Sequence, residues 1–508
     1  MLGEAPLPLN PEQLDPRLSR FASPVWALGL LALWLVCTAG LRPLMLPDEG
    51  RYASVALEML NHGARVPTLD GLPFFHKPPL FYWLDMAAMQ LLGTNQFAAR
   101  AASLLGAGLM GLGLFLGLRR WHGQRCAAIA LGVLATSPFF FVAAQFANLD
   151  MLVAGLITLA IFALLRALDE PPRLRLGWLV AGCVACALAM LAKGLIGPVL
   201  PALVIVPWLL VQGRWRQLLG LLHPLGVCVF AARAAPWFVM MQSRFPGFFD
   251  YFFVEQHFRR FAQTSFNNVS PFWFFIAVLP ALTLPWSAWL PLALRRLWHE
   301  RSARVGLYAW WVAAVVGFFS LPSSKIVGYV LPALAPLSVL LALTLAQPRW
   351  RAVLPWLMGG SAIVCVTIVV ALGVWQQPRS NRAVALALTT RMVAGDHVVM
   401  VEEYFYDVPF YAGLTEPVMV VSDWADPELP MRDNGRKELM DAARFDVDRG
   451  RALLRPLSDL GTAPCGSGSA WYVIRRADAR RLAGMQGATR VFADTRTELW
   501  RAPARRCP

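Results

Sequence analysis

Two short segments of the chain combine residue types that can do chemistry at a lipid surface. The first is Pro47-Asp48-Glu49-Gly50-Arg51-Tyr52, and the second is Phe74-Phe75-His76-Lys77-Pro78-Pro79. Together they place two carboxylates, an arginine, a histidine and a lysine between apolar stretches. Charged groups are costly near a bilayer unless they are paired, hydrated or functional. We therefore expect a polar functional site at a membrane surface.

Lysine is rare in this chain, and its positions are informative. The sequence has 42 Arg but only four Lys, and three of the four (Lys77, Lys193 and Lys325) stand where apolar segments end. A compact point charge at these three places favours a binding function for them. The alternative is that they are helix-end side chains that extend to the membrane interface.

The composition is that of a protein that crosses a membrane many times. Of 508 residues, 57% are hydrophobic and 15% are charged, and 17 of the 31 acidic residues follow Trp375. These proportions predict a cytoplasmic N-terminal tail (1–20), a membrane domain (21–375) and a soluble domain (376–508). The first apolar stretch lacks a convincing signal-peptide cleavage site, so we expect it to be a retained first helix.

The net charge of +15 does not indicate a nucleic-acid-binding protein. Most of the excess lies in short loops between apolar segments, which is typical of cytoplasmic loops in membrane proteins. The predicted soluble domain is nearly balanced, with 19 basic residues against its 17 acids. It therefore lacks the basic surface that nucleic-acid binding requires.

The apolar pattern predicts about eleven to thirteen membrane spans. Eleven segments are assigned: 21–41, 98–118, 126–146, 149–166, 176–193, 195–211, 217–238, 271–294, 304–321, 326–346 and 351–375. Segments 48–62 and 79–92 are shorter, and we expect them to be helices on the membrane surface.

Loop charge predicts the orientation of these spans. The loops after the second, fourth, sixth, eighth and tenth spans are rich in arginine, which marks the cytoplasmic side of a bacterial inner membrane. The periplasmic side then holds loops 42–97 and 239–270 and the soluble domain. Ion-coupled transporters place ionisable groups at the membrane midplane. The one-sided cluster here therefore argues against a transporter or lipid flippase.

The periplasmic side offers cations and carboxylates for phosphate chemistry. Arginine and lysine bind phosphate oxygens and stabilise a phosphate leaving group. The candidate phosphate ligands are Arg51, Lys77, Lys193, Arg259, Arg260 and Lys325. Asp48 is the main catalytic candidate, as a base or as a metal ligand. Glu49 is a second catalytic candidate, or alternatively it stabilises the N-terminus of helix 48–62.

A divalent metal site is a further hypothesis. His76 and His257 both fall in periplasmic loops near carboxylates. With Asp48 or Glu49 they would supply nitrogen and oxygen ligands suited to Zn²⁺ or Mn²⁺. The alternative is two hydrated loop histidines, since the sequence has no closely spaced histidine pair.

Six of the eight cysteines fall in apolar segments, where cysteine behaves as a small hydrophobic residue. Cys183 and Cys186 have the spacing of a redox or metal motif, but they lie within an apolar helix without further ligands. Cys465 and Cys507 belong to the soluble domain and could form a disulfide in an oxidising compartment.

An ordered set of motifs over residues 20 to 345 resembles the polyprenyl-phosphate-sugar-dependent membrane glycosyltransferases. This superfamily includes the aminoarabinose transferases of lipid A and the protein O-mannosyltransferases. The matching pieces are the two segments above, Glu58-Met59-Leu60, Tyr82-Trp83, Asn148-Leu149-Asp150, Leu191-Ala192-Lys193-Gly194, Glu255-Gln256-His257-Phe258-Arg259-Arg260-Phe261, Ser324-Lys325 and Gly328-Tyr329-Val330-Leu331-Pro332.

The resemblance implies a fold, a reaction and a set of roles. The fold would be a GT-C type α-helical polytopic membrane protein with a small periplasmic C-terminal domain. The reaction would transfer a sugar from an undecaprenyl-phosphate carrier at the periplasmic face. Asp48 and Asp150 would be the essential acids, and His257 would hold a divalent metal. The phosphate-binding residues would be Arg51, Lys77, Lys193, Arg260, Lys325 and Tyr329.

The most specific function that fits is an inverting transfer of 4-amino-4-deoxy-L-arabinose to a lipid A phosphate. The alternative is a protein or other envelope-glycan glycosyltransferase that uses the same type of donor. The aminoarabinose transferases typically have Glu before the Lys-Pro pair, where this chain has His76, so the sugar and acceptor stay open. The soluble domain carries no recognised motif. Its apolar runs at 398–401, 418–421 and 471–474 predict strands of a small α/β or α+β domain.

Overall fold

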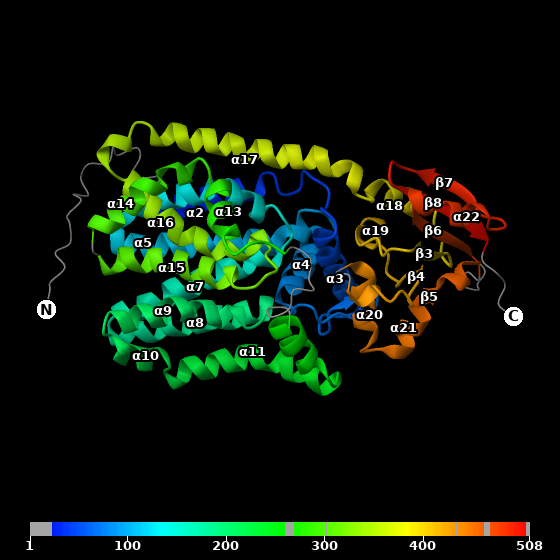
Figure 1. The fold of residues 1–508 in the computed structure, drawn as a ribbon, viewed down its shortest axis with the longest axis horizontal. Helices are drawn as coiled ribbons and strands as arrows, with labels where there is room; N and C mark the ends of the chain where they lie inside the picture. The colour runs from blue at the N-terminus through cyan, green and yellow to red at the C-terminus, as the bar shows by residue number, and fades with distance from the viewer. Residues whose placement is uncertain (1–22, 260–268, 301, 432–433, 462–467, 504–508) are drawn as a thin grey trace.

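The computed structural model describes residues 23–259, 269–300, 302–431, 434–461 and 468–503, with the backbone alone at 257–259. The molecule is elongated (Figure 1). A helical bundle occupies one end, a β-sheet domain occupies the other, and α3 (Asp48–His62) and α4 (Leu80–Leu92) lie between them. The bounds of these two helices agree with the predicted segments 48–62 and 79–92, and their place on the membrane surface stays a prediction.

The described residues contain seven helices that are long and apolar enough to cross a membrane, or eight if one bent pair is a single span. The bent pair, α13 (Phe274–Leu282) with η4 (Trp286–Trp289) and α14 (Leu290–His299), turns by 110°. Each of the eleven predicted segments coincides with helix, but several are too short to span alone. The prediction of a multi-pass helical membrane protein with a small C-terminal domain is confirmed.

The remaining helices of the membrane part have the following bounds. They are α2 (Pro24–Val36), η2 (Ala98–Arg100), α5 (Ala101–Ala135), α6 (Pro138–Ala144), α7 (Leu149–Asp169), α8 (Pro172–Lys193), α9 (Ile196–Val211), α10 (Trp215–Leu221), α11 (Pro224–Arg244), η3 (Asp250–Arg259), α15 (Ala303–Ser320), η5 (Val327–Ala333), α16 (Leu334–Leu345), η6 (Pro348–Trp350) and α17 (Leu354–Gln376). A two-stranded ribbon, β1 (Thr68–Leu69) and β2 (Leu72–Pro73), follows α3.

Helix α5 is a hairpin of two arms rather than one straight rod. Gly123 has φ 80° and ψ 166°, a conformation that breaks the helical path and that glycine adopts without strain. A Cβ placed on Gly111 would lie 3.1 Å from a methyl carbon of Leu131, so the arms pack against each other. A straight helix would separate these residues by about 30 Å. The arms correspond to the two predicted segments 98–118 and 126–146, although the second arm already ends at Ala135.

The arginine-rich loops meet at one end of the bundle, opposite the sheet domain (Figure 1). Trp121 donates its indole N–H to Asp169 over 2.9 Å, and Arg304 contacts the same carboxylate at 3.0 Å. Trp208 donates to the carbonyl of Ala303 over 3.0 Å. These contacts join the loops after the second, fourth and eighth predicted segments to one another and to the last turns of α9, so the structure brings them together on one side.

The C-terminal domain is built on a six-stranded sheet of order β5-β4-β3-β6-β8-β7. Strands β3 to β6 are parallel, and β8 and β7 extend the sheet in antiparallel register. Parallel neighbours require crossover helices, so this domain is α/β with an antiparallel edge. The strands are β3 (His397–Val401), β4 (Met419–Ser422), β5 (Leu454–Pro456), β6 (Ser469–Arg475), β7 (Thr489–Ala493) and β8 (Thr497–Pro503).

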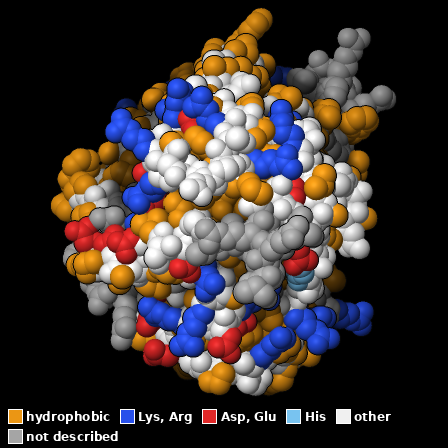
Figure 2. Space-filling model, turned by 90° about the vertical axis from the view of Figure 1, so that its right-hand side faces the viewer, with side chains coloured by type: hydrophobic (Ala, Val, Ile, Leu, Met, Phe, Trp, Pro, Cys, Tyr) orange, Lys and Arg blue, Asp and Glu red, His pale blue; other side chains and the backbone are white. Residues whose placement is uncertain are grey.

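The three predicted strand runs coincide with β3, β4 and β6. The helices of the domain are η7 (Gln377–Arg379), α18 (Arg382–Thr389), α19 (Asp407–Ala412), η8 (Leu429–Met431), α20 (Gly435–Ala443), α21 (Val447–Leu453), η9 (Leu457–Gly461), η10 (Arg476–Asp478) and α22 (Arg480–Ala483). Figure 2 shows acidic and basic side chains together on the surface at this end of the molecule.

The sheet domain is packed directly onto α3. Ser54 on α3 donates its hydroxyl to the carbonyl of Tyr406 over 2.5 Å, and Asp70 accepts from the backbone N–H of Val418 over 2.8 Å. A Cβ on Gly50 would lie 3.1 Å from the Cβ of Tyr406. Buried apolar residues of both parts belong to one continuous core. The domain and the bundle therefore share a tight interface at the start of α3.

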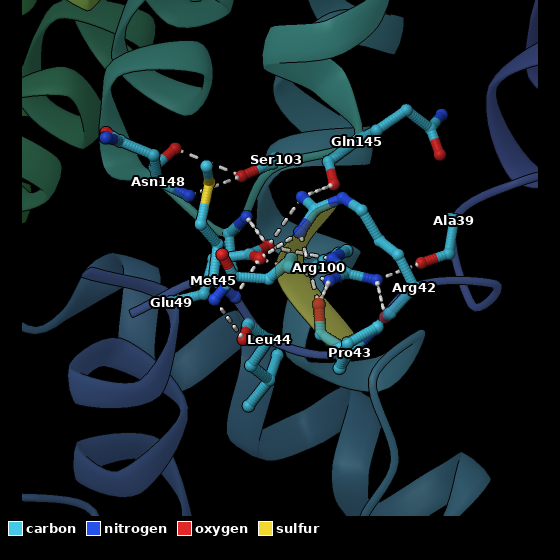
Figure 3. Close-up of polar contacts among 12 residues, drawn as sticks. Ala39, Arg42, Pro43, Leu44, Met45, Glu49, Arg100, Ser103, Gln145 and Asn148 are labelled. Carbon is cyan, nitrogen blue, oxygen red and sulfur yellow. Dashed lines mark hydrogen bonds and ion pairs between the residues drawn. The ribbon is translucent and has the colours of Figure 1, made fainter. Parts of the chain in front are cut away.

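Glu49 holds that start of α3 in place (Figure 3). Its side chain is 0% exposed and lies between the guanidinium groups of Arg42 and Arg100. The carboxylate also accepts the backbone N–H groups of Met45 and Ala147, each over 2.7 Å. Burial alone would raise the pKa of Glu49, but the charges and hydrogen bonds of Arg100 and Arg42 lower it to about 2. Glu49 is thus a structural anion that joins α3 to the start of α5 and to the segment after α6.

We expect Glu49→Gln to destabilise the protein by about 3 kcal/mol, because it leaves two buried cations without their counter-charge. Thermal unfolding in detergent measures this loss. The control is Asp48→Asn, a neighbouring carboxylate that is 42% exposed and should change stability little. Since the pKa of Glu49 lies below the ordinary value of 4.5, its stabilisation is present above that pH and is lost towards pH 2. A constant difference between wild type and variant down to pH 2 would contradict this account.

Candidate functional site

A polar cavity of about 340 Å³ lies where the bundle, α3 and the sheet domain meet. Seven residues singled out in the sequence line it: Asp48, Arg51, His76, Lys77, Asp150, Lys193 and Tyr329. They come from four separate periplasmic regions of the predicted topology. The fold therefore brings most of the predicted site residues to one place.

Arg51 is the centre of the charge network on the α3 side. Its guanidinium donates to Asp48 Oδ1 over 2.5 Å and pairs with Glu438 of α20. Burial alone would lower the pKa of Arg51, but Glu438, Tyr52 and Asp48 raise it well above its ordinary value. Arg51 is therefore a permanent cation shared between a carboxylate of α3 and a carboxylate of the sheet domain.

Lys193 and Asp150 form the second charge pair of the cavity. Lys193 at the end of α8 is hydrogen-bonded to Asp150 in the first turn of α7. The ammonium group lies 4.3 Å from the centre of the Tyr329 ring, at cation–π distance. Asn148 caps α7 by accepting the N–H of Asp150 over 2.8 Å, which fixes that carboxylate at the cavity wall.

Because Gly328 has no side chain, the carboxylate of Asp150 can lie directly against the backbone of residue 328. A Cβ at residue 328 would lie 2.4 Å from Asp150 Oδ2 and 3.1 Å from its Cγ. Real Cβ atoms do not approach other atoms so closely, so any larger residue at 328 must move the carboxylate. The glycine is therefore required by close packing against a site residue, not by its backbone angles.

His76 faces the sheet-domain side of the cavity. Its Nδ1 lies 3.9 Å from Glu438 Oε1, and its ring stacks on Phe74 with 4.6 Å between ring centres. Glu438 also accepts the hydroxyl hydrogen of Tyr406. A carboxylate of the sheet domain is thus present beside the position where the aminoarabinose transferases typically have Glu and this chain has His76.

A second, mostly apolar cavity of about 540 Å³ adjoins the polar one. The two share four lining residues: Asp48, Asn148, Asp150 and Ile326. The other walls come from α6, α13, η5 and α17 and are largely aliphatic and aromatic. The polar cavity therefore continues into a space that suits a hydrocarbon chain.

Two predicted residues lie elsewhere than expected. Glu49 is buried in the Arg42–Arg100 cluster and does not line the cavity, so its predicted catalytic role is corrected to a structural one. Lys325 is 4% exposed and donates to the carbonyls of Ser270 over 2.9 Å and Pro322 over 2.5 Å. It ties two chain segments together and does not line the polar cavity, and its predicted phosphate contact stays a prediction.

Other predicted residues lie outside the described part of the structure. The side chains of His257, Arg259 and Arg260 are among them, as are Cys465 and Cys507. Among the side chains that the structure describes, no group of three His, Cys, Asp or Glu could hold a metal ion. His76 and Asp48 do line the same cavity, and the Zn²⁺ or Mn²⁺ site with His257 stays a prediction.

Four residues of the sheet domain line the polar cavity although the sequence did not indicate them as site residues. Tyr406, Asn434, Gly435 and Glu438 all line the polar cavity. Asn434 caps α20 by accepting the N–H of Lys437, and this directs Glu438 in the first turn towards Arg51. The Asn-Gly-Arg-Lys-Glu pattern does predict a helix start. Nothing local in it indicates that the helix meets residues from the other end of the chain.

The chain is similar to known membrane glycosyltransferases. The family described as dolichyl-phosphate-mannose-protein mannosyltransferase matches residues 38–252. An undecaprenyl phosphate-α-4-amino-4-deoxy-L-arabinose arabinosyl transferase of Erwinia tasmaniensis is 36% identical, over 61% of this chain and 57% of that protein. The corresponding transferase 2 of Pseudomonas fluorescens is also 36% identical, over 65% of this chain and 60% of the relative. The chain thus matches less than two thirds of the length of these relatives.

Solved structures show the same fold. ArnT from Cupriavidus metallidurans bound to undecaprenyl phosphate superposes with a TM-score of 0.81, at 24% identity, over 94% of this chain and 97% of that one. The archaeal oligosaccharyltransferase AglB from Archaeoglobus fulgidus superposes with a TM-score of 0.55, at 13% identity, over 91% of this chain and 70% of that one. The predicted fold class is confirmed over nearly the whole chain.

Proposed function

We propose that this chain is a polyprenyl-phosphate-sugar-dependent membrane glycosyltransferase and that it transfers 4-amino-4-deoxy-L-arabinose from undecaprenyl phosphate to a lipid A phosphate. The observation that carries the proposal is the junction of the two cavities at Asp48, Asn148 and Asp150. A lipid-linked sugar phosphate needs a cationic chamber for its head and an apolar one for the first part of its chain. The polar cavity, which we call the polar chamber, and the apolar cavity meet these two needs, and they adjoin each other at shared lining residues.

The cations of the polar chamber would hold the donor phosphate. Arg51, Lys77 and Lys193 line it, and Asp48, Asp150 and Glu438 balance their charge. Preorganised cations stabilise the negative charge that develops on a leaving phosphate. The carboxylates keep Arg51 and Lys193 at fixed positions before the donor binds. A donor phosphate would then take over part of the hydrogen bonding that the carboxylates provide.

The reaction would be a single displacement with inversion at the sugar carbon. An oxygen of the acceptor phosphate attacks the anomeric carbon, and the bond to the polyprenyl phosphate breaks with its electrons leaving on that phosphate. A phosphate acceptor is already anionic near neutral pH and requires no base. The pairing of Asp48 with Arg51 and of Asp150 with Lys193 supports positioning roles for both acids.

The proposed location is the bacterial inner membrane, with the cavities and the sheet domain on the periplasmic side. The arginine-rich loops gather at the opposite end of the bundle, which is the charge pattern of a cytoplasmic face. An undecaprenyl-linked donor in the outer leaflet of that membrane would reach the polar chamber from the bilayer.

A protein or other envelope-glycan acceptor is the alternative within the same superfamily. Hydroxyl acceptors need a base, so activity would depend on a free carboxylate in the chamber. A lipid flippase is the alternative from another class, and it would move its substrate without breaking the sugar–phosphate bond.

The first test is mass spectrometry of lipid A from a deletion strain that carries wild type, Asp48→Ala or Asp448→Asn. Asp448 is an exposed carboxylate of α21 that does not line the chamber. We expect pentosamine on lipid A phosphates with wild type and Asp448→Asn and none with Asp48→Ala, while all three proteins are present in the membrane. Unmodified lipid A with wild type would overturn the lipid A acceptor and direct the search to other envelope glycans.

A second prediction concerns the space beside Asp150. We expect Gly328→Ala to lower turnover about a hundredfold, because a displacement of a catalytic-site group by about 1 Å has effects of that size. The matched control is Gly317→Ala on the neighbouring α15, where a Cβ would meet nothing within 4 Å. Turnover of purified protein with lipid-linked donor measures both, and equal rates would refute a role for the close packing at Gly328.

A third prediction concerns the sheet domain. Glu438→Gln keeps the shape of the side chain but removes its charge, so Arg51 would shift towards Asp48. We expect turnover to fall about tenfold, the size of one charge-assisted hydrogen bond. Asp448→Asn, at an exposed carboxylate of α21 that does not line the chamber, should keep the wild-type rate. If Glu438→Gln is as active as wild type, the sheet domain serves only to cover the chamber.

A further inference from the structure

A third cavity, of about 920 Å³, shares no lining residue with the two cavities of the proposed reaction. It lies where the end of α17 meets loop 41–43, α18 and the turn between β7 and β8. In Figure 1, α17 runs along the bundle from its far end to the sheet domain, so this cavity lies at the junction of the two parts. The residues 364 and 368 of α17 line the apolar reaction cavity, whereas residues 369, 370, 373 and 374 line this one.

The bundle side of the cavity is apolar and exposed. Leu41, Val370 and Val374 line it, with exposed fractions of 70%, 52% and 70%. In the most apolar 18-residue stretch of α17, only 17% of the residues are buried within the protein, so most of this helix faces the bilayer. The apolar wall therefore continues the lipid-facing surface of a spanning helix.

The level of the membrane interface can be read from the end of α17. The guanidinium of Arg379 lies 3.8 Å from the centre of the Trp375 ring. Tryptophan and arginine at the end of a spanning helix typically lie at the level of the lipid headgroups. The cavity extends across this level, from Val369 below it to Arg382 above it.

The sheet-domain side of the cavity carries cations. Arg382 of α18 and Arg476 of η10 both line it and are exposed. The nearest acid to Arg476 is Glu498 at 3.9 Å, which Arg490 approaches more closely at 3.2 Å. The acid in the lining, Asp494, uses Oδ1 to accept two backbone N–H groups of its own turn. The upper wall therefore presents two guanidinium groups above an apolar wall.

We propose that this cavity binds an anionic glycerophospholipid of the surrounding leaflet. The acyl chains would lie along Leu41, Val370 and Val374, and the headgroup phosphate would contact Arg382 and Arg476. Apolar surface below the interface and arginine above it match the two ends of such a lipid. The bound lipid would brace the sheet domain against α17, the helix after which the chain enters that domain. This lipid is distinct from the donor and acceptor of the proposed reaction, because the cavities share no lining residue.

The test uses full-length protein purified in detergent and mixed with phosphatidylglycerol or, separately, phosphatidylethanolamine. Native mass spectrometry reports retained lipid, and thermal unfolding reports the stabilisation that binding gives. The variant is Arg382→Gln/Arg476→Gln. The control is Arg451→Gln/Arg480→Gln, which removes two exposed arginines of the same domain that do not line the cavity.

We expect wild type and control to retain phosphatidylglycerol about tenfold better than the variant, and to show a rise in unfolding temperature that the variant lacks. Equal retention by variant and control, or equal retention of the two lipids by wild type, would overturn the proposal. An equal rise in unfolding temperature with inorganic phosphate alone would also overturn it, and would assign the arginines to free anions. Lipid retention and unfolding temperature can both be measured without glycosyltransferase activity, so the two proposals fail independently.

Discussion

The burial of Glu49 between Arg42 and Arg100 is the interaction on which the rest of the site depends. Transfer of these charges out of water is costly, and only their mutual attraction and full hydrogen bonding offset that cost. The carboxylate accepts from both guanidinium groups and from the N–H groups of Met45 and Ala147. It thereby fixes the start of α3, the start of α5 and the segment that leads to α7, and so sets the positions of two acids of the polar chamber, Asp48 and Asp150.

Two adjacent carboxylates therefore have opposite functions. Successive residues on a helix point about 100° apart, so Glu49 turns into the protein when Asp48 turns towards the chamber. Glu49 is 0% exposed, whereas the side chain of Asp48 is 42% exposed and contacts Arg51. The cluster shown in Figure 3 thus holds the first turn of α3 in place, and Asp48 belongs to that turn.

The sheet domain is part of the chamber rather than an appendage. Glu438 reaches Arg51 across the interface, and Tyr406 both hydrogen-bonds Glu438 and packs near Gly50. The charge of the chamber is consequently balanced by residues almost 400 positions apart in the chain. Any movement of the sheet domain would alter the surroundings of Arg51. A lipid bound in the cavity between the end of α17 and the sheet domain would resist such movement.

The sequence by itself determined the helical membrane architecture, the helices α3 and α4, the strands β3, β4 and β6, and most of the cations and acids of the chamber. These follow from local signals: apolar length, alternation, loop charge and residue type at segment ends. The tertiary structure alone decided that Glu49 is structural, that Lys325 binds backbone carbonyls and that Glu438 joins the site. Burial and pairing depend on which distant segments meet, and a local pattern carries no information about that. Two adjacent carboxylates, Asp48 and Glu49, therefore acquired their separate roles only when the chain folded.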